Sequence, residues 1–138
     1  SKPVIMGSYG IGIERILACA IEQNHDADGI IWDKALAPYL AHVIAINMNN
    51  KDVVLHSNQA YKALNEAGID ALFDDRANVS PGFKFKDADL LGMPVQVIVG
   101  EKGLKNGQVE LKVRRTKERS MVAIADLIPT VKKLLSME

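Results

Sequence analysis

The chain has 138 residues, 48% of them hydrophobic and 25% charged, which is ordinary for a globular protein with a single core. Its 17 basic and 17 acidic residues cancel, so the net charge excludes a bulk attraction to nucleic acid, and any such surface must be local. The one cysteine, Cys19, excludes an internal disulfide framework, and no apolar run reaches the roughly 18 residues of a membrane-spanning helix, so we expect a cytoplasmic protein with no membrane partner.

Residues 3–23 predict a strand at Val4 to Met6, then a glycine-rich turn, then a helix. The helix is indicated by apolar residues that recur on one face, namely Ile13, Ile16, Leu17, Ala20 and Ile21. Gly10 and Gly12 let a ligand approach the backbone, and Arg15 lies in the first helical turn, where free N–H groups favour an anion. The segment is a candidate phosphate site, although Gly-x-Gly is also a common turn and Arg15 could be a solvated helix residue.

The next stretch, Asn24 to Gly29, is polar and predicts a turn. His25, Asp26 and Asp28 are residue types that bind metal ions. Turns attract Asp and Asn for their own hydrogen bonds, however, and metal sites need convergent ligands, so we predict no metal site here. After the apolar Ile30-Ile31-Trp32, residues 33–40 include Pro38 and predict a linker into a second unit.

From Ala41 onward, strand patterns alternate with helix patterns. Strands are predicted at 43–48, 69–73, 95–99, 108–114 and 121–124. The run from Val95 to Val99 is almost continuously apolar, as expected of a central parallel strand. The run from Gln108 to Arg114 alternates, which points Val109, Leu111 and Val113 inward and Glu110, Lys112 and Arg114 outward.

Three helices follow from cap and stop signals in the second unit. Asp52 is expected to cap the first helix, which Gly68 stops. Ser80-Pro81 opens the second, whose Phe85, Ala88 and Leu91 face inward, and Gly92 ends it. A third helix carries Pro129 in its first turn. The order βαβαββα predicts an α/β fold with a mixed five-stranded sheet, parallel at its centre and antiparallel toward one edge, covered by helices.

Polar groups follow the predicted strands, where ligands of open α/β sheets bind. They are Asp74-Asp75-Arg76, then Lys84, Lys86, Asp87 and Asp89 on the following helix, then Glu101-Lys102. Turn capping or weak surface ion pairs would also explain them. The sequence contains no Ser/His/Asp set and no Walker-type glycine loop, and the Asn49-Asn50-Lys51 turn lacks the glycines of a dinucleotide-binding fold.

Two parts of the chain resemble known families. Residues 10–17, Gly-Ile-Gly-Ile-Glu-Arg-Ile-Leu, resemble motif 3 of the class II aminoacyl-tRNA synthetases, and residues 41–138 resemble the anticodon-binding domain that follows motif 3 in several of them. The closer similarity is to the bacterial-type prolyl-tRNA synthetases. It rests on Tyr9 to Gly12, Glu22 to Asp26, Gly29 to Trp32, Ala37-Pro38, Asp74 to Arg76, Pro81 to Phe85 and Asp87 to Pro94. Ser8, Glu14 and Asp33 differ from residues frequent in that family.

The resemblance implies a role for each part. Residues 1–32 would be a remnant of a catalytic domain, 33–40 a linker and 41–138 the anticodon-binding domain. Gly10 and Gly12 would line an ATP pocket, and Arg15 would be the catalytic phosphate ligand. The parent enzyme would use ATP and Mg²⁺ to activate proline and charge tRNA(Pro), acting as a homodimer. Motif 3 is one wall of an active site and the chain begins with Ser1, so we expect a piece of a longer protein that is not catalytic alone.

Other interpretations stay open. The anticodon-binding domain could belong to another class II enzyme, such as a threonyl or glycyl synthetase. The chain could also be a stand-alone, non-catalytic RNA-binding module. An upstream reading frame with motifs 1 and 2 would favour the enzyme, and a start codon just before Ser1 would favour the module.

Proline codons begin with CC, so the anticodons carry two adjacent guanines. The Watson–Crick edge of guanine has two N–H donors and one carbonyl acceptor, which a carboxylate beside a cation matches. The candidate anticodon-binding residues are Asp75 with Arg76, which rank first because they directly follow a strand, Lys84, Lys86 with Asp89, and Glu101 with Lys102. Lys112 and Arg114, outward on an edge strand, are expected to contact the RNA backbone.

Overall fold

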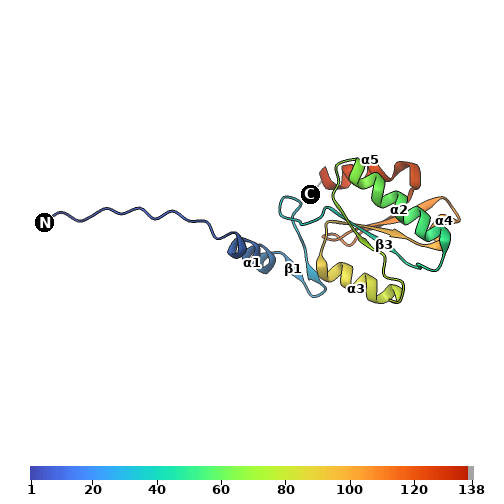
Figure 1. The fold of residues 1–138 in the computed structure, drawn as a ribbon, viewed down its shortest axis with the longest axis horizontal. Coiled ribbons are helices and arrows are strands. Elements are labelled where there is room, and N and C mark those ends of the chain that lie inside the picture. Colours follow the sequence, from blue (N-terminus) through green and yellow to red (C-terminus); the bar gives the residue numbers. More distant parts are fainter. Residues whose placement is uncertain (137–138) are drawn as a thin grey trace.

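The computed structural model describes residues 1–136, which form a sheet domain with a long N-terminal arm (Figure 1). The elements are α1 (Ile13–Gln23), β1 (His25–Asp26), β2 (Gly29–Ile30), β3 (Ala41–Ala45), α2 (Lys51–Glu66), β4 (Ala71–Asp74), α3 (Pro81–Leu91), β5 (Val95–Val99), α4 (Glu101–Leu104), β6 (Gln108–Val113), β7 (Arg119–Ala123), η1 (Ile124–Asp126) and α5 (Leu127–Ser136). None of the helices in residues 1–136 is both long and apolar enough to cross a membrane.

The large sheet of the described residues has five strands in the order β4-β3-β5-β6-β7. β3 pairs in parallel with β4 and with β5, whereas β6 pairs antiparallel with β5 and with β7. The predicted α/β fold with a mixed five-stranded sheet is therefore confirmed, and β5 is its fully buried middle strand. The sequence patterns missed the short helices α4 and η1.

Helices cover the sheet on both faces, with α2 and α5 on one side and α3 on the other (Figure 1). The chain moves outward from β3 to β4 through α2 and back to β5 through α3, so right-handed crossovers place these helices on opposite faces. Val43, Val97 and Leu111 belong to the core on the α2 side, whereas Ile44 and Ile98 pack with Ala88 on the α3 side. After β3 the chain enters α2, and after β5 it enters α4, so these two neighbouring parallel strands lead to different helices.

Two helix signals are confirmed at α3. The Ser80 hydroxyl accepts a hydrogen bond from the Phe83 amide, with Pro81 at the first helical position. Gly92 ends the helix with φ of +75°, a left-handed conformation that favours glycine. The inward prediction for Leu91 is wrong, because this side chain lies at the outer edge of α3 and is exposed.

The cap of α2 differs from the sequence prediction, which placed it at Asp52. The side chain of Asn50 accepts hydrogen bonds from the amides of Asp52 at 2.9 Å and Val53 at 3.3 Å. Asp52 lies instead in the first helical turn, where its negative charge interacts favourably with the positive end of the helix dipole. The turn from Asn47 also ends β3 earlier than expected, since the Asn47 side chain accepts from the Asn49 amide.

We expect Asn50→Ala to lower the free energy of unfolding by about 1 kcal/mol, because two amides lose their acceptor. Asp52→Ala is the matched variant and should cost only a few tenths of a kcal/mol from the lost dipole interaction. Urea denaturation of the two variants measures the difference. A larger loss for Asp52→Ala would restore the original assignment of the cap.

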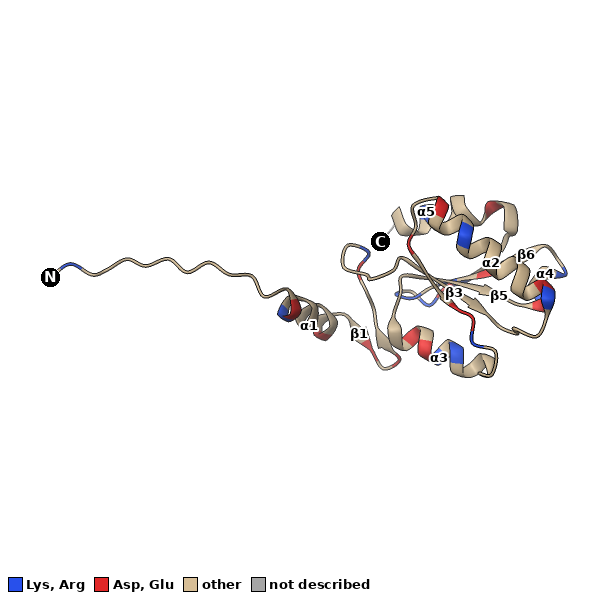
Figure 2. Ribbon diagram, viewed as in Figure 1, with Lys and Arg blue, Asp and Glu red and all other residues tan. Residues whose placement is uncertain are grey.

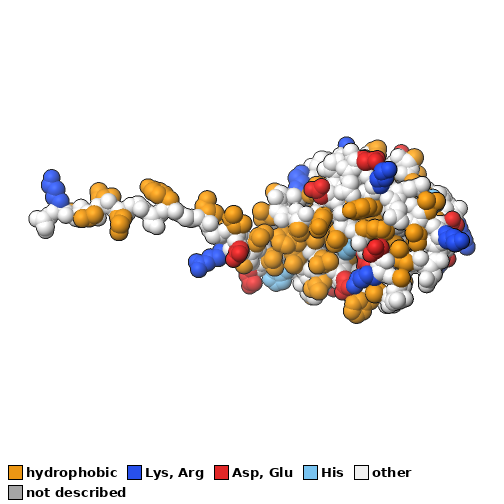
Figure 3. All heavy atoms as spheres, in the orientation of Figure 1, with side chains coloured by type: hydrophobic (Ala, Val, Ile, Leu, Met, Phe, Trp, Pro, Cys, Tyr) orange, Lys and Arg blue, Asp and Glu red, His pale blue; other side chains and the backbone are white. Residues whose placement is uncertain are grey.

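The strand predicted at Val4 to Met6 is wrong. Residues 1–12 form neither helix nor strand, and Val4, Ile5 and Met6 are 88–96% exposed. A strand needs a neighbour to satisfy its backbone groups, and no other described residue pairs with this segment. The predicted helix is present as α1, but its apolar face, with Ile13, Ile16 and Leu17, is also uncovered (Figure 3).

The segment predicted as a turn at 24–29 is a short hairpin, β1 and β2, that packs against the end of α3. The Asp26 side chain closes the hairpin by accepting from the amides of Asp28 and Gly29. A Cβ at Gly92 would lie 1.9 Å from the Ile30 carbonyl oxygen, so glycine allows this close approach. The Trp32 indole donates to the Leu91 carbonyl at 2.9 Å. The division of the chain at residues 32 and 40 stays a prediction.

Candidate functional site

Polar side chains on the α3-facing side of β5 and β6 form a buried network. Lys112 Nζ donates to both Asp89 carboxylate oxygens, at 2.6 and 2.8 Å, and Gln96 Nε2 donates to Asp89 Oδ1 at 2.8 Å. Burial alone would raise the pKa of Asp89, but the hydrogen bonds from Lys112 and Gln96 outweigh it and hold the pKa below its ordinary value. The expected Lys86–Asp89 pair is therefore wrong, and Lys86 is exposed.

Arg114 extends this network to the hairpin. Its guanidinium donates to both Asp26 carboxylate oxygens, at 3.0 and 2.7 Å, and to the Asp89 carbonyl at 2.9 Å. The Arg114 hydrogen bond is the main reason why the pKa of Asp26 lies well below its ordinary value. Lys112 and Arg114 are 6% and 1% exposed, so their outward placement on an edge strand is wrong. β6 is an inner strand, and α3 and the hairpin cover both side chains.

A third buried cation lies at the carboxyl ends of β3 and β4. Lys84 has no exposed surface, and its Nζ donates to the Ala45 carbonyl at 2.7 Å and lies 3.6 Å from Asp74 Oδ1. Arg76 donates to both oxygens of Asp74 and to Asp87 Oδ2 at 2.8 Å. The expected pairing of Arg76 with Asp75 is wrong, because Asp74 and Asp87 take the guanidinium, and Asp75 is exposed beside them.

Arg76 borders a hollow of about 340 Å³ at the outer edge of β4, here called the β4-edge hollow. It is lined by His42, Leu72, Phe73, Asp74, Asp75, Arg76, Asp87, Leu90 and Leu91. Three carboxylates face one guanidinium in this lining, so the charge there is net acidic. An acidic lining repels RNA phosphates.

A second hollow of about 400 Å³ lies where the carboxyl ends of β3 and β5 diverge, and we call it the switch-point hollow. It is lined by Ile46, Ile98, Gly100, Glu101, Lys102, Gly103, Glu110 and Met121. Ile98, Glu110 and Met121 are neighbours across three strands, which makes a largely apolar floor. A Cβ at Gly103 would lie 2.7 Å from the Gln108 carbonyl oxygen, so this wall depends on glycine.

The walls of the switch-point hollow carry charges of both signs, which gather around α4 (Figure 2). Glu101 accepts from Asn47 Nδ2 at 2.8 Å, and Glu110 accepts from Arg119 Nη1 at 3.0 Å. The exposed Lys102 forms no side-chain hydrogen bond or ion pair with another residue of 1–136. An apolar floor with carboxylate acceptors and a cation suits a flat heterocycle that has N–H donors and a carbonyl.

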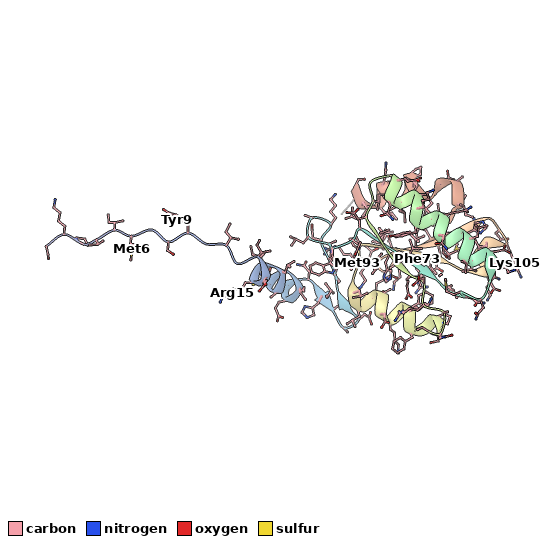
Figure 4. The ribbon with its side chains drawn as sticks, viewed as in Figure 1. Met6, Tyr9, Arg15, Phe73, Met93 and Lys105 are labelled. Atoms are coloured by element: carbon pink, nitrogen blue, oxygen red, sulfur yellow. The ribbon has the colours of Figure 1, made fainter. Side chains whose placement is uncertain are left out.

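The predicted ATP residues lie far from this hollow. Arg15 projects from the exposed helix α1, on the side of the sheet domain that faces the arm, whereas Lys105, next to α4, lies on the far side (Figure 4). A Cβ at Gly10 would meet no atom within 4 Å, so the chain there is open on all sides. The assignment of Gly10, Gly12 and Arg15 to ATP stays a prediction. Within residues 1–136, no group of three or more His, Cys, Asp or Glu residues converges on a metal position.

Sequence reasoning missed Glu110 and Met121 as members of the site. The alternation of β6 did indicate that Glu110 shares a face with Lys112, but it treated that face as solvent. The topological rule for ligand sites could have found the hollow, since Ile46 and Gly100 follow the two strands that diverge.

Comparison with known proteins agrees with this architecture. A family model described as "Anticodon binding domain" matches residues 41–134. A Proline--tRNA ligase of Desulforamulus reducens is 44% identical over 134 residues, covering 97% of this chain and 23% of that protein. The Proline--tRNA ligase of Thermodesulfovibrio yellowstonii is 48% identical over 130 residues, covering 89% of this chain and 23% of that protein. The Proline--tRNA ligase of Geotalea daltonii is 50% identical over 130 residues, covering 94% of this chain and 22% of that protein.

These relatives confirm the resemblance to prolyl-tRNA synthetases that the sequence motifs predicted. The chain spans about a quarter of the length of the curated relatives it matches. The matched residues 41–134 include the whole five-stranded sheet and the lining residues of both hollows. Because the family model covers well over half of its residues, this chain belongs to the anticodon-binding domain family.

Proposed function

We propose that the switch-point hollow binds an unstacked base of the anticodon loop of tRNA(Pro). The observation that carries this proposal is the combination of an apolar floor with Glu101, Lys102 and Glu110 at the crevice between β3 and β5. Membership of the anticodon-binding domain family supports it. Lys102 supplies a free ammonium, which can contact a phosphate or a base carbonyl beside the bound base.

The other predicted anticodon residues have different places in this proposal. Asp75 and Arg76 line the β4-edge hollow, which we rank second because its cation, Arg76, is already bound by Asp74 and Asp87. Lys84, Asp89, Lys112 and Arg114 line neither hollow, because each is engaged inside the domain. Lys86 is exposed on α3 and remains available to the RNA backbone.

For the whole protein, the names of the relatives support a proline–tRNA ligase that consumes ATP. Magnesium, a homodimer and a cytoplasmic location belong to this proposal, as does an ATP-binding role for Gly10, Gly12 and Arg15. The 138-residue chain alone carries one wall of such a site and should not activate proline. The same relatives favour the prolyl enzyme over a threonyl or glycyl one, and a stand-alone RNA-binding module is the alternative.

We expect the chain to bind an anticodon stem-loop with two guanines more tightly than one with two adenines. Lys102→Ala should weaken the binding of both RNAs to the same extent, and it should reduce the slope of log K against log salt by about 1. Lys132→Ala, an exposed lysine of α5 on the opposite face of the sheet, is the matched control and should bind as the wild type. Fluorescence anisotropy at several salt concentrations measures these affinities.

Arg76→Ala decides between the two hollows in the same assay. If Arg76→Ala weakens binding and Lys102→Ala does not, the base lies in the β4-edge hollow and our ranking is wrong. Equal affinity of the wild-type chain for the guanine and adenine loops would contradict the proposed function itself.

A further inference from the structure

We infer that Glu110 is the residue that distinguishes guanine from the other bases in the switch-point hollow. Its carboxylate would accept the N1–H and N2–H groups of the Watson–Crick edge at the same time. This inference rests on the proposed binding of an anticodon base there, and it names the group that reads the base.

Glu110 is the acidic side chain on the floor of the hollow. It stands on β6 directly opposite Ile98 of β5 and Met121 of β7, so apolar side chains flank it on both sides. Its side chain is 28% exposed. A bound base would exclude water from this position, and a charge-assisted hydrogen bond is stronger where water is excluded.

Arg119 holds this carboxylate in place from the neighbouring strand. Its Nη1 donates to Glu110 Oε1 at 3.0 Å, and Arg119 itself is half-exposed at the edge of the sheet. A carboxylate has about four lone-pair sites, so one such bond leaves both oxygens able to accept more. Arg119 is therefore a positioning residue for Glu110.

Glu101 is less suited to this role. It lies on the rim of the hollow at the start of α4 and is exposed, and it accepts one hydrogen bond from the Asn47 amide at 2.8 Å, as Glu110 does from Arg119. No comparable side-chain amide of residues 1–136 contacts Glu110. The half-buried carboxylate, held by one guanidinium, is the better-ordered acceptor of the two.

Guanine is the one standard RNA base whose Watson–Crick edge has two adjacent N–H positions, N1–H and N2–H. Adenine, cytosine and uracil each present one donor position there, beside one or two acceptors. Two parallel N–H groups match the two oxygens of one carboxylate, as an arginine fork does. Acceptor groups of the other bases would instead face the Glu110 charge. Lys102, on the wall of the same hollow, is left to contact a phosphate beside the bound guanine.

Inosine tests this geometry, because it lacks only the N2 amino group of guanine. We expect replacement of the bound guanine by inosine to weaken binding of the wild-type chain roughly 10- to 100-fold. Glu110→Gln has one oxygen and should bind the guanine and inosine loops with nearly equal, weaker affinity. Glu118→Gln, an exposed acid in the turn before β7, is the matched control and should keep the full discrimination.

Arg119→Gln tests the positioning role, and it should reduce the guanine-to-inosine ratio without abolishing binding, with partial rescue by Arg119→Lys. Unchanged urea midpoints for the Glu110 and Arg119 variants would exclude misfolding as the cause. If Glu110→Gln binds RNA and discriminates as the wild type does, the inference is overturned and the proposed function survives. If the wild-type chain binds none of the loops, both the inference on Glu110 and the proposed function are overturned.

Discussion

Replacing Asp74 with alanine should lower the free energy of unfolding by about 3–5 kcal/mol, because it leaves a buried cation without its carboxylate. Lys84 has no exposed surface, and its Nζ lies 3.6 Å from Asp74 Oδ1. Without Asp74 the ammonium keeps only backbone carbonyls as partners. Burial alone would raise the pKa of Asp74, but hydrogen bonds from Arg76 and the charge of Lys84 hold it below its ordinary value.

Asp87→Ala is the matched control. Asp87 also pairs with Arg76, at 2.8 Å, but the Arg76 side chain is 43% exposed, so losing this pair should cost less than 1 kcal/mol. The double variant Asp74→Ala/Lys84→Met removes both buried charges and should recover part of the loss. Urea denaturation measures all of them, and equal losses for the Asp74 and Asp87 variants would disprove the special cost of the buried lysine.

Stability should also fall between pH 6.5 and pH 4 because of His42. This side chain is 2% exposed on the α3 face of β3, and burial lowers its pKa from 6.5 to about 4. Nearby Asp74 and Asp87 oppose the shift, and Arg76 adds to it. In this window the unfolded chain binds a proton that the folded chain does not, so stability rises with pH. The loss at pH 4 should be about 3 kcal/mol.

His42→Leu should flatten the dependence of unfolding free energy on pH in this window. His25→Gln, at an exposed histidine of the hairpin, should retain the slope and serves as the control. Asp74 and Asp89 have lowered pKa values, so the stability they provide is lost only at more acidic pH. A wild-type curve that stays flat from pH 6.5 to pH 4 would show that His42 takes up its proton in the folded state.

Local signals in the sequence were sufficient for most of the fold. The apolar run of β5 and the Ser80, Pro81 and Gly92 signals of α3 depend on neighbouring residues, so they could be interpreted without the tertiary structure. The strand expected at Val4 to Met6 failed for the opposite reason. Its formation depends on a partner strand, and no local pattern reports whether one is present.

The candidate site was less accessible to sequence reasoning, because its electrostatics are long-range. Alternation along β6 correctly separated the two faces, but it could not tell that α3 and the hairpin cover the face with Lys112 and Arg114. The partner of Arg114 is Asp26, 88 positions away in the sequence. The hollow was partly anticipated, through Glu101 and Lys102, from the rule that ligands bind beyond the carboxyl ends of strands.

The docked hairpin gives the molecule a mechanical property. The Ile31 amide donates to the Asn24 carbonyl at the end of α1, and Arg114 and Trp32 fasten the adjoining residues to the sheet and to α3. Hydrogen bonds therefore run without a break from α1 into the sheet domain. A rotation of α1 about Asn24 would break the hydrogen bond from Ile31, so we expect α1 to keep its direction relative to the sheet domain. The switch-point hollow, beside α4, would then stay at a fixed distance from α1.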